Sequence, residues 1–185
     1  RAEDPERPRR PGEEAPLTIV TADAAAAQAR WQGREEALAD AVIFARDLIT
    51  EPANVIYPES FVERTREAFR GVGGERIEAL DVDQMERLGM GSILAVGRGS
   101  ARPPRMLIVE YSGPGADGPP VVLAGKGITF DSGGISLKNP QGMWAMKGDM
   151  AGAAAVVAAA LSLARSRAPV HVVAIAALAE NMPGG

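Results

Sequence analysis

Residues 121–155, VVLAGKGITFDSGGISLKNPQGMWAMKGDMAGAAA, contain the pattern that decides the fold prediction. The stretch opens on an apolar run typical of a strand, Val121 to Ala124, and closes on a segment rich in Ala and Val that is typical of a buried helix. Glycines and charged residues fill the space between the two. The charged side chains that stand out are Lys126, Asp131, Lys138 and Asp149, with Lys147 beside the last.

Charged residues in so apolar a context need a partner, a ligand or an exposed edge, because burying an unpaired charge costs several kcal/mol or shifts its pKa. Two carboxylates and a lysine lie on glycine-rich connections at the ends of apolar elements. Such an arrangement could form an oxygen-rich cation site.

The chain around this stretch alternates between strand-like and helix-like segments. We predict strands at 77–82, 92–96, 105–111, 121–125 and 170–178, helices at 83–88 and 150–165, and a loop at 113–120. This order predicts an α/β fold with a mixed central sheet covered by helices on both faces.

The N-terminal part adds helices and a charged segment. Residues 1–16 hold nine charges and four prolines, and we expect a linker or tail there that packs weakly on the rest. Residues 17–20 could form one short strand, and Asp23 could cap an alanine-rich helix. Helical spacing predicts a helix at 34–49, stopped by Pro52, and a second helix from Pro58 to Phe69.

Composition excludes several classes of function. The 185 residues carry a net charge of −4, which argues against non-specific nucleic-acid binding. Without cysteine there is no disulfide and no thiolate metal site. We find no apolar run long enough for a membrane span and no signal-peptide pattern from Arg1 on, so we expect a cytoplasmic protein.

The motifs GKGITFDSGGISLK and MWAMKGDMAGAAA resemble the leucyl aminopeptidases, the hexameric two-metal enzymes of peptidase family M17. The spacing of the lysines and aspartates is in the family's register. The likeness extends back to Ala45-Arg46-Asp47-Leu48 and Glu51-Pro52-Ala53-Asn54, and forward to Glu180-Asn181-Met182-Pro183. It therefore covers roughly residues 40–185, and residues 17–185 are expected to form the N-terminal half of a three-layer catalytic domain that is incomplete here.

The resemblance implies a role for each residue. Lys126, Asp131 and Asp149 would bind divalent metal, with Asp131 reaching towards a second ion, and Asp149 would also pair with the substrate's free amine. Lys138 would be catalytic, contacting the scissile carbonyl oxygen. Met146 would line the pocket for the first side chain. The implied cofactors are two Mn²⁺ or Zn²⁺ ions, with bicarbonate in the complete enzyme.

Each of these residues also has a plainer interpretation. Lys126 could be a strand-end lysine that reaches water, and Lys138 an exposed loop lysine. Asp131 could form an Asx-type turn, and Asp149 could cap the following helix. Met146 could belong to the core.

Residues outside this set are expected to play structural parts. Arg46 and Asp47 are interpreted as a surface or interdomain salt bridge. His171 starts a strand and is taken as structural. Glu180 and Asn181 are expected near the rim of the site as support.

By resemblance, the function is release of N-terminal amino acids, with a leucine-type preference, from peptides by metal-activated water in a homo-hexamer. The family's later signature, Asn-Thr-Asp-Ala-Glu-Gly-Arg, would follow Pro183, so we expect the chain alone to bind at most one metal well and to show little activity. Two alternatives stay open: a non-catalytic structural or regulatory member of the family, and a metal-binding module of another hydrolase class.

Overall fold

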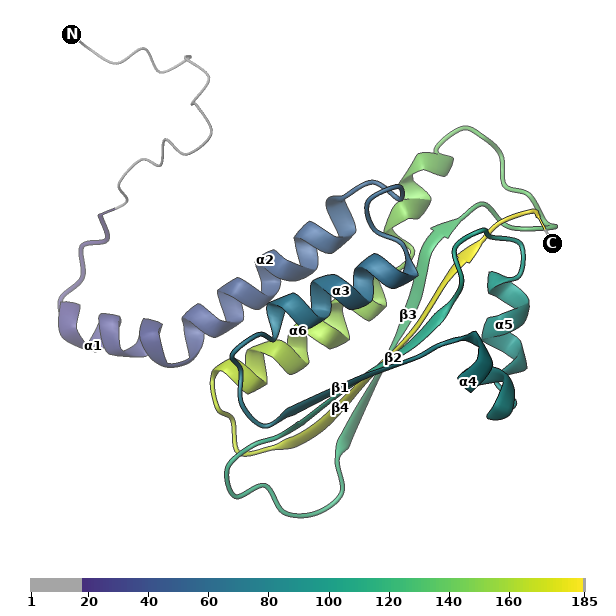
Figure 1. Ribbon diagram of the computed structural model, residues 1–185. Helices are drawn as coiled ribbons and strands as arrows, with labels where there is room; N and C mark the ends of the chain where they lie inside the picture. The colour runs from purple at the N-terminus through teal and green to yellow at the C-terminus, as the bar shows by residue number, and fades with distance from the viewer. Residues whose placement is uncertain (1–17, 185) are drawn as a thin grey trace, which may run out of the picture.

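The computed structural model describes residues 18–184 (Figure 1). The charged segment 1–16 and Leu17 lie outside the described residues, so the predictions for them stay predictions. The elements follow in this order: α1 (Ala24–Arg30), η1 (Trp31–Glu35), α2 (Glu36–Thr50), α3 (Pro58–Ala68), β1 (Glu75–Leu80), α4 (Val82–Arg87), α5 (Gly91–Gly97), β2 (Arg105–Ser112), β3 (Val121–Asp131), η2 (Met143–Gly148), α6 (Ala151–Arg165) and β4 (His171–Asn181).

The strands form one mixed sheet in the order β1-β2-β4-β3. β2 is antiparallel to both of its neighbours, and β3 is parallel to β4. Because parallel neighbours need a crossover, α6 carries the chain from the end of β3 back to the start of β4. The last strand in sequence therefore lies inside the sheet, beside β3.

Helices cover both faces of this sheet, as predicted. α2, α3 and α6 lie on one face, and the shorter α4 and α5 lie on the other (Figure 1). The core lies between the sheet and the longer helices, and alternate residues of β2 point into it. Leu107, Val109 and Tyr111 are fully or almost fully buried there.

The start of α6 lies directly against β3, and Gly125 makes this possible. A Cβ atom at Gly125 would lie 2.4 Å from the carbonyl oxygen of Gly152 in the first turn of the helix. The alanines that follow in α6 are buried in the same core, because small side chains allow a helix to approach a sheet closely.

One element is of a different type from the prediction. Residues 92–96 were expected to form a strand, but they lie in the helix α5, which contacts β4. A short apolar run fits a strand or a buried helix equally well, and tertiary contacts decide between them. Here the run covers the second face of the sheet.

The N-terminal helices are longer and more continuous than predicted. Helical structure runs without a break from α1 through a π-helical turn, η1, into α2. Asp23 caps α1 by accepting a 2.9 Å hydrogen bond from Ala26 N, as expected. The short strand predicted at 17–20 is absent from residues 18–20, and Leu17 lies outside the described residues.

The helical segment Met143–Arg165 is long and apolar enough to cross a membrane by length and composition, with a mean hydropathy of 1.3. This corrects the expectation that no such run exists. The α6 part of the segment packs between α2 and the sheet, and its apolar residues belong to the core. Its composition is that of a core helix, which satisfies the same test.

Candidate metal and substrate site

A β-bulge in β3 places Lys126 and Asp131 on the same face of the sheet. They are five positions apart in sequence, so in a regular strand their side chains would point to opposite faces. The pairing with β4 shifts by one residue between Ile128 and Phe130, and one extra residue in a strand restores a common face. Lys126 accordingly pairs with Ala177 and Asp131 with Asn181, four residues apart on β4.

This position differs from the predicted one. The strand was expected to end at 125, with Lys126 following it, but β3 continues to Asp131. Lys126 is therefore in the middle of an edge strand, and its side chain is largely exposed. Asp131, at the strand's end, is almost buried.

Three donors surround the carboxylate of Asp131. Its Oδ1 accepts hydrogen bonds from Gly133 N at 3.0 Å and from Asn181 Nδ2 at 2.7 Å. Its Oδ2 accepts one from Lys138 Nζ at 2.8 Å. The bond from Gly133 closes the Asx-type turn expected from sequence, so the turn and the ion pair coexist in one carboxylate.

These contacts fix the charge on Asp131. Burial by itself raises the pKa of the carboxyl group, but the hydrogen bonds from Lys138, Gly133 and Asn181 outweigh it and lower the pKa to about 2. Asp131 is therefore ionised at neutral pH. The hydrogen bond to Asp131 likewise raises the pKa of Lys138 above its ordinary value, and the charge of Asp149 adds to the rise.

Asp149 forms the second pair of the site. Its Oδ2 lies 2.7 Å from Lys126 Nζ. Its alternative role, capping the following helix, is not seen: Met150 occupies the N-cap position of α6 and no side chain caps that helix. The reason is that η2 runs almost directly into α6, so Asp149 lies one residue before the N-cap position. Its carboxylate points to Lys126 instead.

The structure thus brings together the four charged residues singled out from sequence as two neighbouring lysine–aspartate pairs. Lys126 with Asp149, and Lys138 with Asp131, lie close enough for Asp149 to act on the pKa of Lys138. Asp131 and Asp149 are the only acidic residues in this group. Within residues 18–184 there is no cluster of three or more His, Cys, Asp and Glu side chains suited to a metal ion.

The donor set nevertheless fits a divalent ion. Asp149 Oδ2 is shielded from solvent and makes no hydrogen bond, although Lys126 Nζ is near. The Lys126 ammonium group, 2.7 Å away, balances the charge of this oxygen, and a divalent ion would take over that role once the amine is neutral. Carboxylate oxygens and a lysine amine, once neutral, are ligands that Mn²⁺ and Zn²⁺ accept.

Several predicted roles concern residues beside these pairs. Met146 is half-buried in η2, three residues before Asp149. His171 lies 3.0 Å from Glu110 through Nε2, at the start of β4 and away from the lysine–aspartate pairs. Within residues 18–184 neither Arg46 nor Asp47 forms an ion pair, and the interdomain form of the salt-bridge interpretation stays a prediction.

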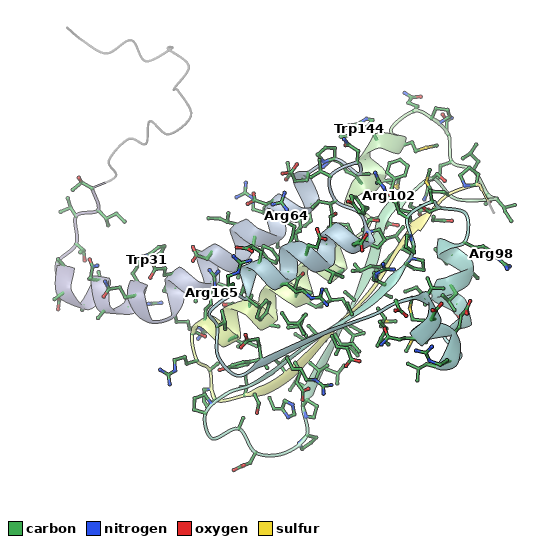
Figure 2. All side chains as sticks on the ribbon, viewed as in Figure 1. Trp31, Arg64, Arg98, Arg102, Trp144 and Arg165 are labelled. Carbon is green, nitrogen blue, oxygen red and sulfur yellow. The ribbon has the colours of Figure 1, made fainter. Side chains whose placement is uncertain are left out.

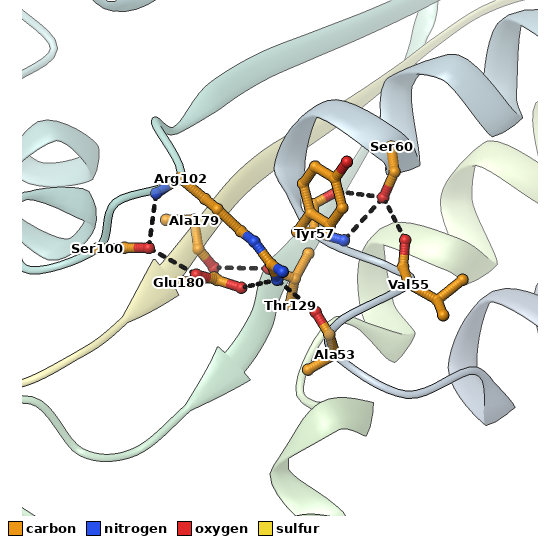
Figure 3. A network of polar contacts seen from close by, with 9 residues as sticks. All are labelled: Ala53, Val55, Tyr57, Ser60, Ser100, Arg102, Thr129, Ala179 and Glu180. Carbon is orange, nitrogen blue, oxygen red and sulfur yellow. Dashed lines mark hydrogen bonds and ion pairs between the residues drawn. The ribbon is translucent and has the colours of Figure 1, made fainter.

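Glu180 and Asn181 lie side by side but act on opposite faces of the sheet, as neighbouring residues of a strand do. Asn181 contacts Asp131, as expected for a supporting residue. Glu180 is buried and accepts hydrogen bonds from Ser100 Oγ at 2.5 Å and Arg102 Nη1 at 2.9 Å (Figure 3).

The guanidinium of Arg102 extends this network. It also donates to Ala53 O at 2.6 Å and lies 4.2 Å from the ring centre of Tyr57. The network joins the end of β4 to the loops before α3 and β2 (Figure 3). Sequence reasoning did not find Arg102, because nothing near it in sequence marks its partners.

The chain is similar to known proteins of one family. Residues 43–185 match the catalytic-domain model of the cytosol aminopeptidase family. A probable cytosol aminopeptidase of Nitrobacter hamburgensis is 48% identical over 170 residues, 91% of this chain and 33% of that protein. A counterpart from Geobacter sulfurreducens is 46% identical over 182 residues, 95% of this chain and 36% of that protein. The chain spans about a third of the length of the curated relatives it matches.

Solved structures agree with these matches. The bottromycin maturation enzyme BotP in complex with Mn is 43% identical, with a TM-score of 0.77 over 85% of this chain and 34% of that one. The cytosol aminopeptidase from Coxiella burnetii is 30% identical, with a TM-score of 0.73 over 80% of this chain and 32% of that one.

Proposed function

Because this chain belongs to the cytosol aminopeptidase family, we propose that it serves the metal-dependent release of N-terminal amino acids from peptides. The observation that carries the proposal is the convergence of the two lysine–aspartate pairs beside the second half of β3. Asp131 is buried, the Oδ2 atom of Asp149 is shielded from solvent, and each of the two faces a lysine that the family's register singles out.

In this proposal Lys126, Asp131 and Asp149 hold the metal, and Asp131 also faces a second ion. The ions, when bound, acidify a water molecule and polarise the peptide carbonyl. The Asp131 carboxylate stays ionised because its three donors favour the charged form. The residues named here accept either Mn²⁺ or Zn²⁺, and the Mn complex of BotP supports Mn²⁺.

Lys138 provides a positive charge at the same end of the strand. Its ammonium group is partly exposed, so it can turn from Asp131 Oδ2 to a carbonyl oxygen of the substrate. A fixed positive charge near that oxygen stabilises the negative charge that develops in the reaction. Asp149 would pair with the free amine of the substrate, which restricts cleavage to the N-terminus.

The remaining features follow from the family resemblance and are part of the proposal. Met146 would contact the substrate's first side chain and favour leucine-type residues. The complete enzyme would be a homo-hexamer of the cytoplasm that uses bicarbonate as a proton shuttle. No described residue is assigned to the bicarbonate.

A chimera tests the proposal. The 185 residues replace the matched segment of the Nitrobacter hamburgensis relative, and hydrolysis of leucine anilide is measured with added Mn²⁺ or Zn²⁺. We expect turnover in the chimera and little in the chain alone. Asp131→Asn and Asp149→Asn should weaken metal binding in calorimetric titrations, whereas Asp117→Asn, in an exposed loop, should not.

Lys138→Met separates chemistry from metal binding. It should lower kcat by about 100-fold or more, as the loss of an oxyanion donor does, while the affinity for metal changes little. A chimera without turnover would favour the non-catalytic alternative. If Asp131→Asn and Asp149→Asn both bind metal as tightly as the unmodified chain, the proposed metal site is refuted.

A further inference from the structure

The 3₁₀-helix η2, which leads into Asp149, has little stabilisation of its own. Gly142 precedes it in the left-handed region, with φ of 80°, and no side chain caps its start. Runs of 3₁₀-helix longer than three or four residues are uncommon, because the hydrogen-bond geometry is poor. A helix of this kind with six residues depends on contacts with other elements.

Lys147 makes the polar contact that joins η2 to α2. Its Nζ donates to Ile49 O at 2.8 Å and to Thr50 O at 2.6 Å. Both are last-turn carbonyls of α2, which lack partners within the helix. α2 has no basic residue in its own last turn, so Lys147 supplies the positive charge that favours a helix C-terminus.

The backbone next to Lys147 lies against the same helix end. A Cβ atom at Gly148 would be 3.7 Å from Ile49 Cγ2, an ordinary van der Waals distance. Lys147 therefore contacts the C-terminus of α2 through its charge, and Gly148 lies beside the same helix end, with room for no more than a Cβ atom in ordinary contact. This contact lies immediately before Asp149.

The geometry of a 3₁₀-helix relates this contact to the site. Residues three apart lie on one face, so Met146 and Asp149 share a face, and Trp144 and Lys147 share another. Because Trp144 is 73% exposed, the polar contact of that face with α2 is made by Lys147. Fixing Lys147 on α2 therefore sets the rotation of η2 about its axis, and with it the direction of Met146 and Asp149.

We propose that Lys147 is a positioning residue, which holds η2 on the C-terminal carbonyls of α2 so that Asp149 meets the metal and Met146 meets the substrate. The inference rests on the proposed function, because that function assigns Asp149 to the metal. Lys147 itself touches neither.

Replacing Lys147 by Met tests this role, because Met keeps most of the apolar stem and removes the ammonium group. Binding of Mn²⁺ to the 185-residue chain is measured by calorimetry and by the electron paramagnetic resonance of the bound ion. We expect Lys147→Met to weaken binding by about 10-fold, the lower end of what loss of an outer-shell partner costs. Lys147→Arg, which keeps the charge and the donors, should restore most of the affinity.

Arg165 provides a matched control. Its Nη2 donates to Ala68 O, the last residue of α3, at 3.1 Å, so it makes the same kind of contact with a helix end. It lies at the far end of α6 from η2, as the separation of Arg165 and Trp144 in Figure 2 shows. Arg165→Met should lower the melting temperature and leave Mn²⁺ affinity unchanged.

Each outcome decides one question. Unchanged Mn²⁺ affinity in Lys147→Met would overturn the inference, and so would an equal loss in Arg165→Met. If Lys147→Met does not fold, Lys147→Gln, whose amide NH2 keeps two N–H donors without the charge, should bind Mn²⁺ more weakly than wild type but not lose binding altogether. Wild-type affinity in Lys147→Gln would overturn the inference. If Asp149→Asn binds Mn²⁺ as tightly as the wild-type chain does, the proposed function itself is refuted.

Discussion

Asn181 donates its side-chain amide to Asp131 Oδ1 at 2.7 Å, and this bond joins the last residue of β4 to the last residue of β3. The backbone carbonyl of Asn181 also accepts from Ser132 N at 3.0 Å and from Ser132 Oγ at 2.7 Å. Gly134 approaches so closely that a Cβ atom there would lie 2.4 Å from Asn181 Oδ1. Asn181 therefore holds both the carboxylate and the turn that follows it.

Asn181→Ala should weaken the binding of Mn²⁺ by about 10- to 100-fold, because a ligating carboxylate loses the partner that orients it. Calorimetric titration of the chain measures the affinity. Asn139→Ala is the control, since the side chain of Asn139 accepts only a local bond from Gln141 N in an exposed loop. Equal affinities for the two variants would contradict the role given to Asn181.

Gly125→Ala should destabilise the fold by about 1–3 kcal/mol, the cost of overpacking a close contact. The added Cβ would lie 2.4 Å from the backbone of Gly152, so α6 would have to move away from β3. Urea unfolding measures the loss. At Gly73 an added Cβ meets nothing within 4 Å, and Gly73→Ala should stay within about 0.5 kcal/mol of wild type.

Arg102→Met should cost about 3–5 kcal/mol of unfolding free energy, because it leaves the buried carboxylate of Glu180 without its counter-charge. Arg105→Met is the matched control: its partner Glu59 is 3.5 Å away and largely exposed, and such pairs contribute about 0–1 kcal/mol. The double variant Arg102→Met with Glu180→Met should recover part of the loss. If Arg102→Met and Arg105→Met unfold at the same urea concentration, the Arg102–Glu180 pair contributes no more to stability than the exposed pair.

Tyr111 should remain protonated at a pH where an exposed tyrosine ionises. Burial raises its pKa above the ordinary 10.0, and the nearby Arg167 only partly offsets this. The unfolded chain loses this proton first, so stability should fall as the pH rises above about 10. The chain has two tyrosines, so tyrosinate absorbance in Tyr57→Phe reports Tyr111 alone. Titration of that variant at or below pH 10 would disprove the shift.

The sequence predicted most elements because their signals are local. Pro58 opens α3, Asp23 caps α1, and the four strands of the sheet begin within two residues of their predicted starts. The error at 92–96 shows the limit of such signals. Five apolar or small residues fit a strand and a buried helix alike, and only their contact with β4 settles the choice.

In the candidate site, too, some features could be predicted from the sequence and others only from the structure. Spacing and family resemblance singled out Lys126, Asp131, Lys138 and Asp149, and the structure brings all four together. The partners Lys147 and Arg102 were missed as contacts. Their acceptors lie 97 or 98 residues and 49 or 78 residues away in sequence, and no local pattern reports a contact over such a separation.

By itself, the sequence determined which side chains carry the charges and the alternating order of elements that makes an α/β fold. The tertiary structure decided that β4 lies between β2 and β3, and that a bulge at the end of β3 turns Asp131 to the same face as Lys126. The physical reason is that a strand's side chains alternate with a period of two. One unpaired residue reverses every direction after it, and only the pairing with a neighbouring strand shows where that residue lies.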